Sequence, residues 1–328
     1  MTSAPILWAA FVVVLLLAVG LLGPAFLRKA APALVRVPRV AIALVAGGIL
    51  IWPTALLSLG LVLAWVASGT AILPGGMADV CQQCLASANP FTATAFDTRI
   101  PSVVLIAVPV LAGTVATLSV AAEYRSRIRC SRQTATLVLD GASRKILQGH
   151  EVSLVTDDRP WALAFPSRHG GIALSTGAIK RLDPNELAAV LAHEDAHLRQ
   201  HHHVVSDLVA SIATHLRWVP FIREAAAALP SYLEIAADDQ ACQRAGTPAL
   251  VRALLILGEP TVPVGGALPA TGPLLAAGPD RIPHLVRPET SKQGYLPAVA
   301  ASAQLIILGV VSAVVLTSYA GALLTGCI

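Results

Sequence analysis

Residues 183–207 read DPNELAAVLAHEDAHLRQHHHVVSD, and this stretch predicts a helix that carries a metal site. Asp183 suits the N-cap, Pro184 the first helical position, and Glu186 the place where a capping box needs its carboxylate. Apolar residues then recur at helical spacing and give the helix one side to bury: Leu187, Val190, Leu191 and Leu198.

His193 and His197 are four residues apart, so both imidazoles project from the same face of this helix and can bind one metal ion. Glu194 follows the first histidine and supplies a carboxylate that can accept a proton from water. The pattern H-E-x-x-H therefore predicts one Zn²⁺ ion per chain, with Glu194 as the catalytic residue.

A catalytic zinc ion needs a third protein ligand. The stretch SYLEIAADDQACQRAG, residues 231–246, predicts a second helix that ends at Gly246, and Glu234 on it is the expected third ligand. Asp238 lies one turn further on the same face, where it can orient a metal-binding histidine. The run His201–His203 is different, since adjacent histidines point in different directions; it is interpreted as a polar helix end near a membrane surface.

The composition indicates a membrane protein. Hydrophobic residues make up 55% of the 328 positions, charged residues only 13%, and the mean hydropathy is +0.70. Four apolar runs are long enough to span a bilayer: about 5–27, 40–66, 101–122 and 296–325. They contain essentially no ionisable residues, which argues against a transporter. The formal charge of +4 is small, so we expect no direct nucleic-acid binding.

Basic residues set the expected orientation. Arg28, Lys29, Arg36 and Arg39 follow the first run, and four further arginines at 125–132 follow the third. The positive-inside rule then places both termini outside the cytoplasm. The chain is predicted to have four parts: three transmembrane helices in 1–123 with an extracytoplasmic loop over 68–99, a cytoplasmic domain over 124–257, a Gly/Pro-rich connector over 258–295, and the fourth transmembrane helix over 296–325. Cys81 and Cys84 in the loop suggest a local disulfide.

The segment AFPSRHGGIALSTGAIKRLDPNELAAVLAHEDAH, residues 164–197, together with EIAAD at 234–238, resembles the gluzincin pattern of integral-membrane zinc metallopeptidases. Two groups share the pattern: the CAAX-processing and heat-shock membrane proteases, and the beta-lactam sensor-transducers, which are antirepressor peptidases. Three spans before the domain and one after it resemble the second group, in a short form without the penicillin-binding sensor domain. Many relatives carry Asp five residues after the second metal histidine, where this chain has His202.

The resemblance implies an α-helical multi-pass membrane protein with an α+β, zincin-like metalloprotease domain in the cytoplasm. Short strand-like pieces precede the metal helix, over 152–156, 161–165 and 171–174. Zinc peptidases usually set an edge strand above that helix, where an extended substrate pairs through its backbone. The candidate for this strand consists of Trp161, Ala162, Leu163, Ala164 and Phe165; the alternative is a strand that only packs the core.

The expected activity is a zinc-dependent metalloendopeptidase that cuts a cytosolic or membrane-proximal protein. By resemblance, that protein is a transcriptional repressor and the role is regulatory signalling. Two alternatives stay open: a quality-control protease of the membrane, and a metal-binding receptor that does not cut. The sequence leaves the oligomeric state undetermined.

Overall fold

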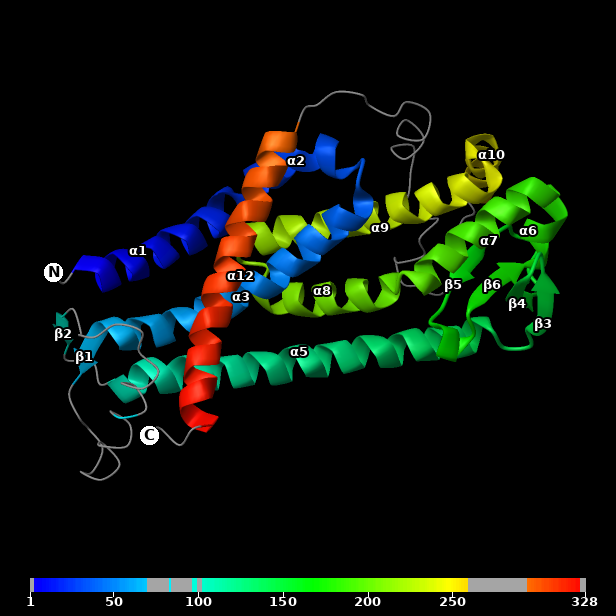
Figure 1. Ribbon diagram of the computed structural model, residues 1–328. Coiled ribbons are helices and arrows are strands. Elements are labelled where there is room, and N and C mark those ends of the chain that lie inside the picture. Colours follow the sequence, from blue (N-terminus) through cyan, green and yellow to red (C-terminus); the bar gives the residue numbers. More distant parts are fainter. Residues whose placement is uncertain (1–2, 70–82, 84–95, 99–101, 259–293, 325–328) are drawn as a thin grey trace.

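The computed structural model describes residues 3–69, 83, 96–98, 102–258 and 294–324. Within these residues, four helices are long and apolar enough to cross a membrane. A small mixed sheet and several shorter helices gather at the end of the molecule away from the N-terminus (Figure 1). The predicted fold class, a helical multi-pass membrane protein with an α+β domain, is confirmed.

The membrane-length helices extend further than the apolar runs that predicted them. Helix α1 (Ser3–Leu17) continues through a π-helical turn, η1 (Ala18–Leu22), into α2 (Gly23–Leu34). The other three are α3 (Pro38–Val66), α5 (Ser102–Val138) and α12 (Tyr295–Leu324). Strands β1 (Ala67–Gly69) and β2 (Phe96–Thr98) form a short parallel pair between α3 and α5.

Helix α5 connects the membrane helices to the sheet. Its 37 residues span about 55 Å at about 1.5 Å per residue, whereas a bilayer core is about 30 Å thick. The helix does not stop at the predicted end of the third span, residue 122. Beyond it, Arg127 pairs with Glu123 one turn earlier at 2.9 Å, which supports a helix in water.

The sheet has four strands: β3 (Ser143–Leu147), β4 (His150–Val155), β5 (Ala162–Ala164) and β6 (Ile172–Ser175). Their order is β3-β4-β6-β5, with β4 and β6 parallel and the other pairs antiparallel. The three predicted strands each overlap an observed one. Strand β3 was not predicted because it is mostly exposed and its two apolar residues, Ile146 and Leu147, are adjacent and give no alternating pattern.

Helices α6 (Thr176–Arg181), α7 (Pro184–Arg199) and α10 (Thr247–Leu257) pack near the sheet, and a short 3₁₀ turn, η2 (Ser167–His169), precedes β6. The predicted apolar side of α7 is buried against it. One hydrophobic cluster contains residues of the sheet, α7 and α10: Val152, Ala162, Ile172, Leu174, Val190, Leu191, Ala253 and Leu257.

Helices α8 (His202–Leu216) and α9 (Pro220–Ala245) form a hairpin whose tip lies among the membrane helices (Figure 1). We refer to residues 202–233 as the α8–α9 hairpin. Buried residues of the hairpin share one cluster with residues of α1, α3 and α12: Val209, Ile212, Phe221, Ile222 and Leu229 with Val12, Val45, Ile49, Leu305 and Leu308.

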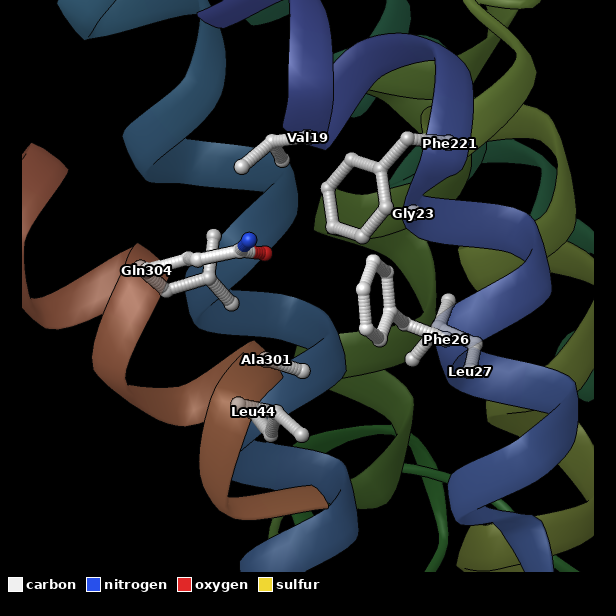
Figure 2. Close-up of a pocket in the computed structure, with 9 residues that line it drawn as sticks. Val19, Gly23, Phe26, Leu27, Leu44, Phe221, Ala301 and Gln304 are labelled. Carbon is white, nitrogen blue, oxygen red and sulfur yellow. The ribbon is translucent and has the colours of Figure 1, made fainter. Parts of the chain in front are cut away.

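Aromatic residues anchor the hairpin tip. The rings of Trp218 and Trp52 meet edge to face at 6.5 Å, and Nε1 of Trp52 donates a hydrogen bond to the carbonyl oxygen of Leu16 at 3.0 Å. Phe221 lines a small apolar pocket between α2, α3 and α12 (Figure 2). The tip therefore reaches the level of Leu16, inside the first apolar run.

Several sequence predictions fall outside the described residues. Cys81, Cys84, almost all of the extracytoplasmic loop and nearly all of the connector lie there. The run His201–His203 is described. His201 is exposed, has φ 52° and forms the turn between α7 and α8. The interpretation as a polar helix end is wrong for His202, which is only 4% exposed.

Candidate metal centre

Helix α7 begins with the predicted capping box. Oδ1 of Asp183 accepts hydrogen bonds from the backbone N–H groups of Asn185 and Glu186, both at 2.8 Å. Oε2 of Glu186 accepts one from the N–H of Asp183 at 2.9 Å. These bonds satisfy amide donors that a helix start would otherwise leave unpaired. The helix therefore starts at a defined residue, which sets the direction in which its later side chains project.

Helices α7 and α9 approach each other through small side chains. Ala189 and Ala192 of α7 and Ala241 of α9 are buried in one cluster with Ala249 and Leu250 of α10. The separation of two packed helices depends on the side chains between them, so alanines allow a close approach. This close approach lets one side chain of α9 reach the histidines of α7.

The predicted ligands meet in a buried cluster. Nε2 of His193 lies 3.1 Å from Nε2 of His197. Oε2 of Glu234 lies 3.5 Å from Nε2 of His193, and Oε1 lies 3.4 Å from Nε2 of His197. All three residues are less than 9% exposed.

These distances fit a tetrahedral metal ion. Ligand atoms with bonds of about 2.0–2.1 Å at tetrahedral angles lie about 3.3 Å from one another. The three observed separations are 3.1, 3.4 and 3.5 Å. Two imidazole nitrogens and one carboxylate oxygen are a ligand set that zinc takes in catalytic sites. His193, His197 and Glu234 therefore form a zinc site, as the sequence predicted.

Asp238 contacts the first metal histidine from behind. Its Oδ1 lies 3.0 Å from Nδ1 of His193, on the opposite side of the ring from Glu234. Burial lowers the pKa of His193, but the carboxylates of Asp238 and Glu234 outweigh burial and raise that pKa to about 10. The pocket therefore favours positive charge at this point, as a cation site requires.

Glu194 is completely buried, at 0% exposure, and follows His193 on α7. The side chain of a buried carboxylate in this position is shielded from bulk water. Its neighbour Asp195, for which the sequence suggested no role, is also buried. It lies close to basic side chains from α7, α9 and β4. Its carboxylate lies 2.7 Å from Nε of Arg199, 3.4 Å from Nη1 of Arg244 and 3.9 Å from Nδ1 of His150.

His202 is a site residue that the sequence analysis missed. Its Nδ1 lies 2.9 Å from Nδ1 of His197, on the side of that ring away from the metal site. Burial is the main cause that lowers the pKa of His202 to about 4, and the charges of His193, His203 and Arg39 add to it. The signal that could have found this contact is the position of His202, five residues after the second metal histidine.

The predicted substrate strand lies at the edge of the sheet. Among the described residues, strand β5 pairs with β6 on one side only, and it packs near α7. Ala162 and Phe165 are buried in the core, whereas Leu163 and Ala164 are half-buried. Nε1 of Trp161 donates a hydrogen bond to Oδ2 of Asp157 at 3.0 Å.

Residues 129–245 match the family model described as Peptidase family M48. This segment begins within α5 and ends with α9, so it contains the sheet and all three metal ligands. No solved structure matches the chain. The matched segment, the buried two-histidine, one-glutamate site and the four membrane-length helices together identify a zinc metallopeptidase of the membrane, whose residues 129–245 are similar to Peptidase family M48.

Proposed function

We propose that this metallopeptidase is an endopeptidase that cuts protein segments next to the cytoplasmic face of the membrane. The observation that carries the proposal is that α9 begins among the membrane helices and ends at the metal site. Its first half packs among the membrane helices, and its second half supplies Glu234. Nη1 of Arg28, directly after the first apolar run, pairs with Glu224 of α9 at 3.0 Å. About 15 Å of helix separates Glu224 from Glu234, at about 1.5 Å per residue.

The orientation rests on charge. Arginines and a lysine follow the first and third apolar runs, and two of them, Arg28 and Arg127, contact the helix pair α8 and α9 that leads to the metal site. Such residues are enriched on cytoplasmic loops. The proposed orientation therefore has both termini outside the cytoplasm and the peptidase domain in it.

His193, His197 and Glu234 are the residues that bind the zinc ion. When bound, zinc polarises a carbonyl group and makes water more acidic. Glu194 is proposed to accept a proton from the attacking water and to return it to the leaving nitrogen. Its complete burial supports this role, because a carboxylate without competing water is a better proton acceptor. Asp238 is proposed to accept a hydrogen bond from Nδ1 of His193, which leaves the lone pair of Nε2 for the metal.

Strand β5 is proposed to bind an extended substrate. Its edge position supports this role, because the outer backbone groups of an edge strand can pair with an added chain. Ala164, which is half-buried, would then lie nearest to substrate side chains, while Ala162, Leu163 and Phe165 fix the strand in the core.

The first experiment measures zinc content and proteolysis of the purified full chain in detergent. Unfolded casein serves as a generic substrate, and wild type is compared with Glu194→Gln and Glu234→Ala. We expect one zinc per chain in wild type and Glu194→Gln, less in Glu234→Ala, and cleavage by wild type only. Glu194→Gln should lower activity by at least ~100-fold, the scale of general acid–base catalysis. Full activity of Glu194→Gln would overturn the assignment of this residue.

The biological substrate has two candidates. The arrangement of three spans before the domain and one after it resembles that of the beta-lactam sensor-transducers, which supports one transcriptional repressor as substrate. The segment 164–197 resembles the heat-shock membrane proteases equally, which supports quality control of membrane proteins. Mapping new protein N-termini in cells that express wild type or Glu194→Gln separates the two. A single regulator cut only by wild type supports the first, and many membrane proteins support the second.

A further inference from the structure

The two metal histidines are contacted from behind by different chemical groups. Asp238 supplies a carboxylate oxygen to Nδ1 of His193 at 3.0 Å. The equivalent atom of His197 instead meets Nδ1 of another histidine, His202, at 2.9 Å, and the two rings lie edge to face. Metal-binding histidines usually donate their second N–H to an oxygen, so this pairing needs its own explanation.

A turn between α7 and α8 makes the contact. His201 adopts the left-handed conformation, with φ 52° and ψ 36°, and α8 starts directly after it. The change of direction brings His202 back over the last turn of α7 and buries it, leaving 4% exposed. Because left-handed backbone is costly for a residue with a side chain, the contacts around it must offset that cost.

The hydrogen bonds define which nitrogen of each ring carries a proton. Nε2 of Gln200 donates to Oε1 of Gln240 on α9 at 3.0 Å, so Oε1 of Gln200 faces Nε2 of His202 at 3.3 Å. Since an amide oxygen only accepts, Nε2 of His202 donates, and its Nδ1 has a free lone pair. That lone pair accepts the N–H at Nδ1 of His197. Nε2 of His197 is then unprotonated and can bind zinc.

We propose that His202 is a positioning residue that fixes the tautomer and ring orientation of the metal ligand His197 through a neutral hydrogen-bond chain from Gln240. The chain connects α7, α8 and α9, so the orientation of the ligand depends on the packing of all three helices. A neutral imidazole places one negative charge less beside the metal than a carboxylate would. The site is therefore less anionic than one with an aspartate behind each histidine.

The test uses two variants of His202 whose side-chain amides place an oxygen at different ring-nitrogen positions of the histidine. The oxygen of Asn in His202→Asn can occupy the place of Nδ1, whereas the oxygen of Gln in His202→Gln reaches the place of Nε2. Zinc affinity is measured by competition with a chelator on the full chain in detergent, in the Glu194→Gln background to prevent self-cleavage. We expect His202→Asn to stay within about threefold of its parent and His202→Gln to bind zinc ~10–100-fold more weakly.

Two further variants sharpen the result. His203→Gln, one position along the same helix, should leave the affinity unchanged. His202→Asp should bind zinc more tightly than His202→Asn, since it restores a carboxylate behind His197. The absorption spectrum of the cobalt-substituted site adds a second readout and should change in His202→Gln but not in His202→Asn.

Equal zinc affinity of His202→Asn and His202→Gln, at the parental value or below it, would overturn the proposal. The experiment measures metal binding and not cleavage, so its outcome is independent of the proposed proton transfer by Glu194. A failure of the substrate proposal would likewise leave this result intact.

Discussion

At the scale of single residues, Asp157 fixes the start of the edge strand. Its Oδ1 accepts the backbone N–H of Arg159 at 2.9 Å, and its Oδ2 accepts Nη2 of Arg159 at 2.8 Å and Nε1 of Trp161 at 3.0 Å. Its backbone oxygen accepts the hydroxyl group of Thr176 at 2.9 Å. One aspartate therefore sets where the proposed substrate strand leaves the turn after β4.

Asp157 predicts a pH-dependent contribution to stability. The hydrogen bond from the Arg159 side chain is the largest cause that lowers the pKa of Asp157 from 3.8 to about 2. Because the folded pKa is the lower one, the stabilisation is complete above about pH 4 and is lost as the pH falls toward 2. Partial exposure reduces it to about 1 kcal/mol. The melting temperature of Asp157→Asn should fall below that of wild type at pH 7, and the difference should narrow by roughly half at pH 3.

Asp158 gives a matched control for this measurement. Its carboxylate pairs with Lys180 at 2.8 Å, but both side chains are more than half exposed. Exposed ion pairs contribute little to folding stability, so Asp158→Asn should have the same melting temperature as wild type at every pH. A constant difference between Asp157→Asn and wild type from pH 7 to pH 3 would contradict the assignment.

At the scale of elements, the α8–α9 hairpin connects the metal site to the membrane helices. Phe221 at the start of α9 packs against two glycines, Gly23 of α2 and Gly48 of α3. A Cβ atom on Gly48 would lie 2.7 Å from Cζ of Phe221 and 3.0 Å from Cδ1 of Leu305. The hairpin tip therefore fits only where α3 has no side chain.

Adjacent glycines of α3 test this fit. Gly48→Ala should destabilise the protein by about 1–3 kcal/mol, the usual cost of overpacking. At Gly47, apart from its chain neighbours and the nearby backbone of α3, no atom of the described residues lies within 4 Å of an added Cβ. Gly47→Ala should therefore be neutral or stabilising by up to about 1 kcal/mol, since alanine favours the helix. Thermal unfolding in detergent measures both. Equal melting temperatures of the two variants would mean that Phe221 does not dock as described.

The same elements show what the sequence could and could not predict. The start of α7 and the ligands His193 and His197 were predictable, because capping and i, i+4 spacing are local properties. Glu234 was predicted from a second helix, on which Asp238 follows one turn later on the same face. The docking of the α8–α9 hairpin was not. Arg223 and Glu224 interrupt its apolar residues. The burial of those apolar residues, Phe221 among them, depends on glycines of distant helices.

The contact of His202 was only partly predictable, since its position five residues after the second metal histidine was a signal but its geometry was not. It depends on the left-handed backbone of His201, and nothing in a run of three histidines indicates which one turns. Strand β3 was missed for another reason, since an exposed charged strand has no alternating pattern. Local rules thus predicted the metal ligands, and long-range packing decided what surrounds them.

At the scale of the whole molecule, the α8–α9 hairpin connects the metal site rigidly to the membrane-length helices. The membrane helices α3 and α5 both contact the hairpin, and Nη2 of Arg127 on α5 donates to the hydroxyl oxygen of Thr214 on α8 at 3.2 Å. Movement of the site away from the membrane would require the shared hydrophobic cluster to open. The site is therefore held at a nearly fixed distance from the membrane-length helices, which supports the proposal that its substrates lie close to the membrane.

This geometry predicts that cleavage depends on how far a substrate segment lies from the membrane. A casein segment is joined to a single transmembrane helix by flexible linkers of about 5, 20 and 60 residues and placed with the peptidase in lipid nanodiscs. A short linker gives an effective concentration in the millimolar range, which falls as the linker lengthens. We expect cleavage at least ~10-fold faster with the shortest linker than with the longest, and slowest for the free segment at micromolar concentration. Solubilising both proteins in separate detergent micelles should remove the difference. Equal rates for all linkers and for the free segment would show that the membrane does not select the substrate.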